Sequence, residues 1–348
     1  MLLSHRQSFA FKAVSVFAIL MVVIRHGQNL HLYYAGGSPW MPLIDANVLV
    51  QEAITRLTEC AIPVFFTMSG FWFFLGAERW RDIVRKWKHR LRSLVIPYFL
   101  WNFLLLAAVV AAFAVFPPLR RQLISTYGIE WHWVWFAEKF GMHPIVGQFW
   151  YIRTLMIFCL LTPLFLLFYR SFALSAAVLA LLLCRWAPID CGILSSEGLA
   201  CFFFGGFVGC RNWHRRIEYR KAAWALLPCV IGLVGIELYC GVPRWIWILR
   251  IFLSMLLLMQ IALFAAGSSR FRSVIRRLAH FSFFLYAAHV LLLGVSMVPL
   301  SRIAVHVPSA SFAAYVFCIL VSVAAAYGIA WMLDRGCPRV YRMLTGGR

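Results

Sequence analysis

The sequence predicts an all-α polytopic membrane protein with about ten transmembrane helices and with both termini in the cytoplasm. Of its 348 residues, 63% are hydrophobic, and the mean hydropathy is +0.81. Only 13% are charged, against about 25% in an average soluble domain. This composition excludes an ordinary soluble domain and favours a chain that crosses a bilayer repeatedly.

Ten segments of the chain are apolar over lengths near the roughly 20 residues that a helix needs to cross a bilayer. Their predicted bounds are 9–31, 57–76, 94–116, 148–170, 171–188, 198–212, 222–240, 245–267, 279–298 and 312–334. The fifth and sixth are the shortest. No linker, low-complexity tract or internal repeat interrupts the series, so we expect residues 1–348 to form a single transmembrane domain.

Basic residues collect in alternate loops between these segments. With the N-terminus inside, 22 of the 33 Lys and Arg residues lie on the cytoplasmic side and six lie in outer loops. Cytoplasmic loops of membrane proteins carry this excess of positive charge. Topology and anionic lipids therefore explain the net charge of +21 better than nucleic-acid binding does.

Metal, disulfide and nucleotide motifs are missing from the sequence. The ten cysteines occur without a C-x-x-C pair or Cys/His ligand spacing, and no Walker-type or dinucleotide-binding glycine loop is present. Gly205, Gly206 and Gly209 have small-xxx-small spacing, which predicts close packing between two helices.

Several ionisable residues lie at one depth, near the outer ends of their predicted spans. An ionisable side chain in the bilayer costs about 2.5–3.5 kcal/mol on insertion scales, so it normally faces a cavity or a partner. The shared depth therefore predicts a polar chamber that opens to the extracytoplasmic side. Snorkelling to the interface is the alternative for the basic residues, and pairing with Arg56 is the alternative for Glu59. The residues concerned are Arg25, His26, Arg56, Glu59, Arg153 and Arg250.

His26 stands apart from the others because imidazole cannot snorkel far and exchanges protons near neutral pH. His289, in the middle of a span, is similar, and a hydrogen-bonded packing role is the alternative for both. The pair Ser69-Gly70 lies inside the otherwise apolar stretch Ile62–Trp72. Small residues there would let a ligand approach the backbone.

Five motifs, in this order, resemble those of the acyltransferase family 3 membrane proteins, ten-span enzymes that acylate extracytoplasmic glycans. Each motif is weak alone, but five in order are specific. They are Ala18–His26, Ile62–Phe71, Arg90–Tyr98 with Trp101, Phe149–Arg153 with Leu161–Pro163, and Phe281–His289. One position departs from the family pattern: Ser15 stands where an Arg usually precedes the His by eleven residues. Lys12, one turn earlier on nearly the same helix face, is the expected substitute, although a Lys does not bind phosphate bidentately.

The resemblance implies that His26 is the catalytic residue, acting as a general base. Arg153 corresponds to the Arg of the family's Trp-x-x-Arg element, and it would stabilise the oxyanion or orient His26, together with Arg25. The family further implies a cytoplasmic acyl-CoA donor, most often acetyl-CoA, and no metal. The acceptor would be a hydroxyl of an extracytoplasmic or lipid-linked sugar or polysaccharide, and the location a bacterial inner membrane.

Donor and acceptor would then contact different residues. The donor's phosphates are expected on a cytoplasmic basic cluster, and its pantetheine arm would pass Ser69 and Gly70. The cluster comprises Arg85, Lys86, Lys88, Arg90 and Arg92, with Lys12 nearby. The acceptor is expected near Glu59 and near the loop that holds Trp131, His132 and Trp133, whose rings would either stack on a sugar or anchor the loop at the membrane interface.

Two further expectations remain open at this stage. Residues Leu43–Arg56 have apolar residues at helical spacing, which is typical of an interfacial helix. A transporter or flippase for an anionic or glycan substrate is the alternative function, because a chamber lined by His, Arg and Glu suits it equally well. A different membrane acyltransferase fold fits less well because of the Ser-Gly pair in the second span and the His in the first. A purely structural protein fits least, since it gives no reason for Arg25, His26 and Arg153 at matching depth.

Overall fold

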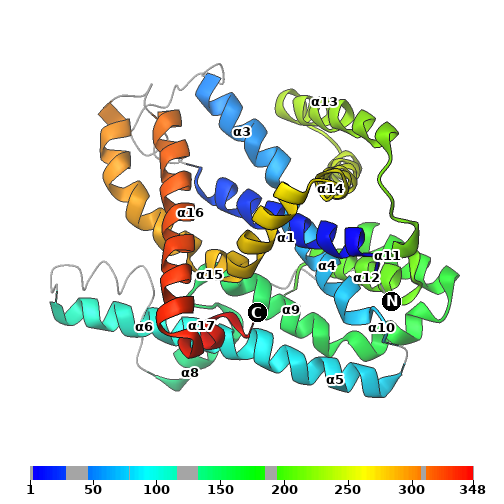
Figure 1. Cartoon of the computed structure of the whole chain (residues 1–348), viewed down its shortest axis with the longest axis horizontal. Coiled ribbons are helices and arrows are strands. Elements are labelled where there is room, and N and C mark those ends of the chain that lie inside the picture. The colour runs from blue at the N-terminus through cyan, green and yellow to red at the C-terminus, as the bar shows by residue number, and fades with distance from the viewer. Residues whose placement is uncertain are drawn as a thin grey trace.

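The computed structural model of the chain describes residues 3–28, 46–77, 79–115, 132–184, 194–306 and 311–347. Within these ranges all regular structure is helical and no strand occurs, as the composition predicts. The helices cross at varied angles around α1 and α4 and do not form one parallel bundle (Figure 1).

The first half of the described chain runs from α1 to α10. Its main helices are α1 (His5–His26), α3 (Ala46–Thr58), α4 (Ala61–Phe74), α5 (Trp80–Arg90), α6 (Ile96–Val115), α8 (Trp133–Ala137), α9 (Trp150–Leu160) and α10 (Thr162–Tyr169). A π-helical segment, Leu91–Val95, joins α5 to α6. Pro163 at the start of α10 cannot continue a preceding helix, and α9 and α10 meet at a bend of 57°.

The second half contains the longest helices. They are α11 (Phe172–Cys184), α12 (Ser196–Cys210), α13 (Leu226–Tyr239), α14 (Arg244–Ala265), α15 (Ser269–His306), α16 (Ser311–Gly336) and the short α17 (Pro338–Thr345). In Figure 1, α17 lies against α6 at the foot of α16. There Trp101 Nε1 donates a hydrogen bond to the Leu344 carbonyl, which fixes the position of α17.

In the described residues, seven helices are long and apolar enough to cross a membrane, and the bent pair α9–α10 makes an eighth if it counts as one span. α11 and α12 are apolar but shorter. Each of the ten predicted segments overlaps at least one helix. The predicted interfacial segment overlaps α3, whose candidate span runs on into α4 as Val48–Phe74; residues 43–45 lie outside the described residues.

α4 lies between the two large hydrophobic clusters of the protein. Phe66, Phe73 and Phe74 pack into a cluster with α9, α10 and α12. Val64 and Met68 pack into a second cluster with α1, α14 and α15. A helix that is apolar all round in this way is buried on all sides, so α4 holds the two halves together.

Glycines bring α4 and α12 into backbone contact. A Cβ on Gly205 would lie 1.9 Å from the Thr67 carbonyl oxygen, and one on Gly209 would lie 2.7 Å from the Phe71 carbonyl oxygen. The close packing predicted from the small-xxx-small spacing is therefore confirmed. Gly70 takes part in the same contact, because its Cβ would lie 2.0 Å from the Phe202 carbonyl oxygen.

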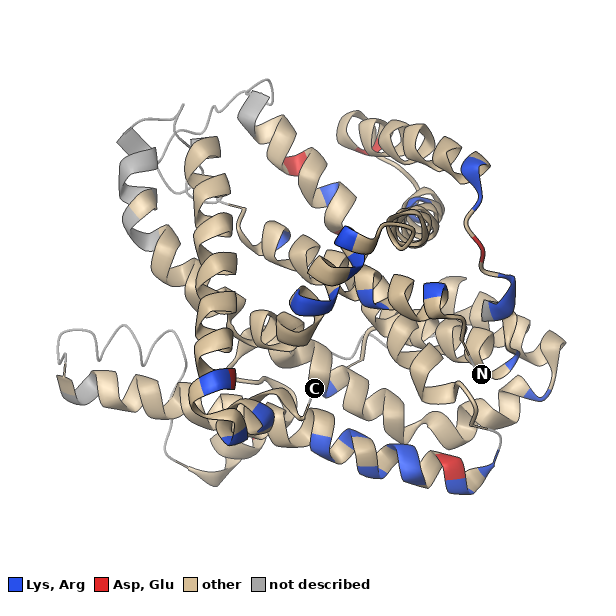
Figure 2. Ribbon diagram, in the orientation of Figure 1, with Lys and Arg blue, Asp and Glu red and all other residues tan. Residues whose placement is uncertain are grey.

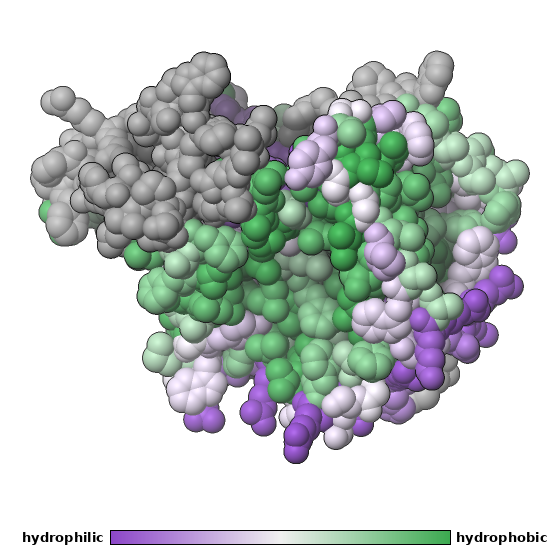
Figure 3. Space-filling view, turned by 90° about the horizontal axis from the view of Figure 1, so that it is seen from above, coloured by the Kyte–Doolittle hydropathy of each residue, from purple (hydrophilic) through white to green (hydrophobic). Residues whose placement is uncertain are grey.

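The surface agrees with a protein that crosses a membrane. Hydrophobic residues cover much of the face in Figure 3, and strongly hydrophilic residues gather toward its lower and right-hand rim. Lys and Arg residues also follow one another along α5, at the lower edge of Figure 2. The same helix is strongly amphipathic, as is expected of a helix at a membrane boundary.

Candidate active site

A cavity of about 840 Å³, here called the central cavity, lies between five helical elements. Its wall is formed by side chains of α1, α4, α5 with the following π-helical segment, α9 and α15. These are Lys12, Ser15, Ile19, Phe65, Met68, Ser69, Trp72, Phe73, Lys86, His89, Arg90, Ser93, Leu94, Tyr151, Ile152, Leu155, Arg276, Ala279, His280, Ser282, Phe283 and Tyr286. This volume falls within the usual range of roughly 300–1,000 Å³ for small-molecule sites.

Four cations on this wall, Lys12, Lys86, Arg90 and Arg276, form what we call the basic wall. Among the described lining residues there is no Asp or Glu, and none of the four forms an ion pair within the described part of the chain. Uncompensated positive charge in a partly enclosed space attracts a multiply charged anion. Lys86 has a second task, because its ammonium donates to the Trp72 and Leu75 carbonyl oxygens at 3.0 and 2.7 Å and so caps the end of α4.

The predicted donor cluster is divided between two faces of the chain. Lys86 and Arg90 line the central cavity, whereas Arg85, Lys88 and Arg92 are exposed and do not line it. The division follows the helical period, since residues four apart share a face. Only Lys86 and Arg90 of the predicted cluster therefore lie at the cavity, and donor binding by the cluster stays a prediction.

α1 supplies a continuous face along the cavity. Lys12, Ser15 and Ile19 line the wall at spacings of three and four residues, and His26 follows seven residues later on the same face. Lys12 thus lies on the same wall as Ser15, the position at which the family pattern has an Arg. This location agrees with substitution by Lys12, and the substitution itself stays a prediction.

Hydroxyl groups gather on the same wall. Ser69 Oγ and Tyr151 Oη lie 3.1 Å apart, and Tyr286, which also lines the cavity, donates its hydroxyl hydrogen to the Gln148 carbonyl at 2.6 Å. Gly70 does not line the cavity, because α12 packs directly against its backbone. Ser69 lines the cavity, whereas the small size of Gly70 serves helix packing. Passage of the donor's arm along Ser69 stays a prediction.

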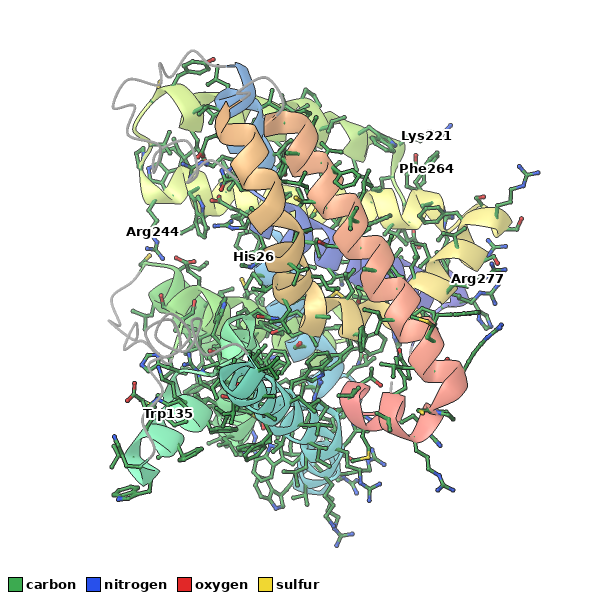
Figure 4. The ribbon with its side chains drawn as sticks, turned by 90° about the vertical axis from the view of Figure 1, so that its left-hand side faces the viewer. His26, Trp135, Lys221, Arg244, Phe264 and Arg277 are labelled. Atoms are coloured by element: carbon green, nitrogen blue, oxygen red, sulfur yellow. The ribbon has the colours of Figure 1, made fainter. Side chains whose placement is uncertain are left out.

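His26 is exposed at the end of α1 and does not itself line the cavity. Its ring centroid lies 5.2 Å from that of His289, which in turn lies 6.2 Å from that of Tyr286. Figure 4 shows His26 beside the ribbon of α15, the helix that carries both partners. A series of three rings therefore leads from the cavity wall to the exposed imidazole.

Next to His26, five charged residues form what we call the Glu59 cluster: Arg25, Arg56, Glu59, Glu237 and Arg250. Arg25 and Arg56 each lie 3.6 Å from Glu59, and Arg250 binds Glu59 at 2.5 Å and Glu237 at 2.8 Å. Trp247 Nε1 also donates to Glu59. The predicted convergence of Arg25, Arg56, Glu59 and Arg250 is thus observed, and so is the Arg56–Glu59 pair.

Arg250 is fully buried, so the snorkelling alternative is wrong for this residue. Both oxygens of Glu59 are engaged by basic groups, which makes the cluster a link between α1, α3, α13 and α14. Binding of an acceptor by Glu59 stays a prediction. For Glu59 to bind an acceptor hydroxyl, one of its contacts with a basic group must be replaced by a contact with that hydroxyl.

Arg153 is buried in α9, and its guanidinium donates to the Met142 carbonyl. It does not belong to the lining of the central cavity. The hydrogen bond from Arg153 to Met142 therefore fixes the segment that precedes α9. Its proposed action on the oxyanion stays a prediction.

The tryptophan loop is only partly described. His132 Nδ1 accepts a hydrogen bond from the Trp135 backbone N–H at 3.2 Å and caps the short helix α8, whereas Trp133 is 79% exposed. Trp135, labelled in Figure 4, is buried against Ile145. Trp131 lies outside the described residues, so the predicted sugar platform rests on Trp133.

Several cavity residues were missed by reasoning from the sequence. The sequence motifs predict no role at a site for Arg276 and His280, which lie in a basic loop and at the start of a span, or for Tyr151 and Tyr286, which lie within motifs. His280 is held by Asp334, with Nε2 and Oδ2 3.0 Å apart. A helical projection of α15 would have placed Arg276, His280 and Phe283 on one face. Among the described residues, no group of three His, Cys, Asp or Glu side chains is placed to hold a metal ion.

The fold and this site define a helical membrane protein with a basic cavity and with a histidine, His26, two helical turns past the last cavity residue of α1. A family model described as an acyltransferase domain matches residues 11–331 of the 348-residue chain, so the chain belongs to acyltransferase family 3 and is a membrane acyltransferase. Comparison with curated proteins and comparison with solved structures each found no match.

Proposed function

We propose that the protein is an O-acyltransferase that moves an acyl group, acetyl in the first instance, from cytoplasmic acyl-CoA to a hydroxyl of an extracytoplasmic or lipid-linked sugar or polysaccharide. One observation carries the proposal. The central cavity combines a basic wall without acidic residues and a face of α1 that leads from Lys12 to His26. A long, polyanionic thioester donor fits such a site.

The donor's phosphates bind at the basic wall, where several cations compensate several anionic charges. Arg90 and Arg276 are the arginines of that wall, and Lys12 is its contribution from α1. From Lys12 to His26 there are fourteen residues, or about 21 Å at 1.5 Å per residue. An extended pantetheine arm carries the thioester along this distance, past Ser69 and Tyr151.

At the far end, His26 removes the proton of the acceptor hydroxyl as the oxygen attacks the thioester carbonyl. A positioned general base contributes about 10²–10⁴-fold to such a reaction. Arg25, next to His26 in the sequence and 3.6 Å from Glu59, supplies a cation for the developing oxyanion. A fixed donor of that kind is worth about 10²–10³-fold.

This mechanism requires a particular topology. We place both termini in the cytoplasm and count ten crossings: the seven long spans, the bent pair α9–α10, and the shorter α11 and α12. The basic wall then faces the cytoplasm, and His26 faces the opposite side. In this arrangement a single domain in a bacterial inner membrane receives acyl-CoA from the cytoplasmic face and the acceptor from the extracytoplasmic face.

Transfer and transport can be separated in one experiment. Purified protein is reconstituted in vesicles, acetyl-CoA labelled in the acetyl group is added on the α5 side, and a surface glycan is enclosed or added opposite. We expect covalent label on the glycan with the wild type, and at least a hundredfold lower rate with His26→Ala at equal amounts of folded protein. Movement of unmodified substrate without labelling would favour a transporter, and unchanged transfer by His26→Ala would remove the assignment of the base.

A further inference from the structure

His289 is fully buried on α15, yet one of its ring nitrogens has no hydrogen-bond partner within the described part of the chain. Its Nδ1 lies 2.7 Å from the Tyr286 carbonyl oxygen, which can only accept, so Nδ1 carries the hydrogen. Its Nε2 has no hydrogen-bond partner among the described residues. A buried polar atom left without a partner is destabilising, so a simple packing role does not explain a histidine here.

The hydrogen on Nδ1 determines what Nε2 can do. A charged imidazolium without an acceptor would be costly in this buried position, so the ring is neutral and Nε2 presents a lone pair. The atom can therefore accept a hydrogen bond but cannot donate one. A hydrogen-bond donor for Nε2 must therefore be supplied by a bound ligand or by a neighbouring side chain that can rotate toward it.

His26 is such a donor. The two ring centroids lie 5.2 Å apart with an angle of 55° between the planes. A hydrogen bond of about 3 Å between ring nitrogens, added to the two ring radii, needs a centroid separation of this size. Because His26 is exposed and ends its helix, its ring has room to turn toward His289.

The surroundings hold His289 firmly in place. The Gln148 side-chain amide donates to the Ala287 carbonyl at 2.8 Å, and the Tyr286 hydroxyl donates to the Gln148 carbonyl at 2.6 Å. Two bonds thus fasten this turn of α15 to the segment before α9. A rigid support of this kind is what a positioning residue needs.

We propose that His289 is a positioning residue that accepts a hydrogen bond from His26 through Nε2, an inference that rests on the proposed function. The acceptor oxygen forms a bond to the acyl carbon and the C–S bond breaks. The hydroxyl proton passes to one nitrogen of His26 and leaves with the thiolate of CoA. Meanwhile the N–H on the other nitrogen of His26 donates to His289, which stabilises the transient imidazolium and takes up no proton itself.

Two amide variants separate this role from packing. His289→Asn retains a group that can donate to the Tyr286 carbonyl but offers nothing at the place of Nε2, whereas His289→Gln reaches that place with a neutral acceptor oxygen. We expect kcat to fall at least tenfold in the Asn variant and to return to within about threefold of wild type in the Gln variant. The KM values for acyl-CoA and for the glycan should stay within twofold in both.

Controls make the outcome unambiguous. Ser296→Ala, two turns farther along α15, removes a hydroxyl bonded to Ser322 and should leave kcat unchanged. In the His26→Ala background, His289→Asn should cause no further loss, because the two residues act as a unit. If His289→Asn does not fold, His289→Met provides a side chain of similar length to Gln without the oxygen.

Several results would overturn the proposal. These are a folded Asn or Met variant with wild-type kcat, a Gln variant as slow as the Asn variant, or losses that appear in KM. If His26→Ala is inactive while His289→Asn is normal, only this inference fails. If His26→Ala transfers normally, the proposed function fails with it.

Discussion

The basic wall and the Glu59 cluster are both rich in cations, but their charges are balanced differently. In the Glu59 cluster, Arg250 binds two carboxylates and is fully buried. In the basic wall, no cation forms an ion pair within the described part of the chain, and the wall borders open space. Paired cations hold helices together; unpaired cations beside a cavity are available to an anionic ligand.

The largest expected effect tests whether the paired cations of the Glu59 cluster stabilise the fold. Arg250→Met leaves Glu59 and Glu237 as buried charges with too few partners, and breaking a buried pair in this way costs about 3–5 kcal/mol. We expect a large drop in thermal midpoint in detergent. Arg90→Met, on the basic wall, is the control and should change the midpoint little. Equal midpoints for the two variants would contradict the distinction.

A smaller effect concerns the two faces of α4. Gly70→Ala places a methyl group 2.0 Å from the Phe202 carbonyl oxygen, so α12 must move, and overpacking of this kind costs about 1–3 kcal/mol. Ser69→Ala, one residue earlier, loses only the contact with Tyr151, worth about 1 kcal/mol. Thermal unfolding of both variants is the measurement. If Ser69→Ala proved the more destabilising, the assignment of the two faces would be wrong.

The third effect sharpens the role of the basic wall. Lys12→Ala should weaken CoA binding about tenfold, because one cation leaves the wall. Adding Ser15→Arg should restore the affinity or improve it, since Arg binds phosphate bidentately from the same face of α1. Equilibrium binding of CoA tests both variants. No recovery in the double variant would show that Lys12 does not substitute for the family's Arg.

Local sequence patterns predicted much of this molecule. The apolar segments and the small-xxx-small packing depend on neighbours in the chain; helices overlap all ten segments, and the glycine packing is confirmed within the described residues. The alternation of basic loops stays a prediction of topology. Ser69, Arg90 and Tyr286 each lie in a motif of the family pattern and all line the central cavity, but the motifs alone do not predict that the three share one cavity.

Properties that depend on partners distant in the sequence could not be predicted in this way. Glu59 binds Arg250 across 191 positions; their shared depth predicts that they lie in one region, but it does not identify the two as partners. The orientation of α5 and the following π-helical segment also depends on distant partners. Arg90 lines the cavity and Arg92 does not because α1, α9 and α15 pack on only one side of this segment. The sequence predicts that the donor's arm passes Gly70, whereas the structure places α12 against it. Local sequence does not reveal this contact, because α12 lies more than 120 residues farther along the chain.

The central claim is that the central cavity binds the donor, and CoA binding to two single variants tests it most directly. Arg90→Glu reverses a charge on the cavity wall, whereas Arg92→Glu reverses an exposed charge on the same segment of chain. We predict that the Kd for CoA rises at least tenfold in Arg90→Glu and less than about twofold in Arg92→Glu. Equal changes in the two variants, or no change in either, would contradict the account.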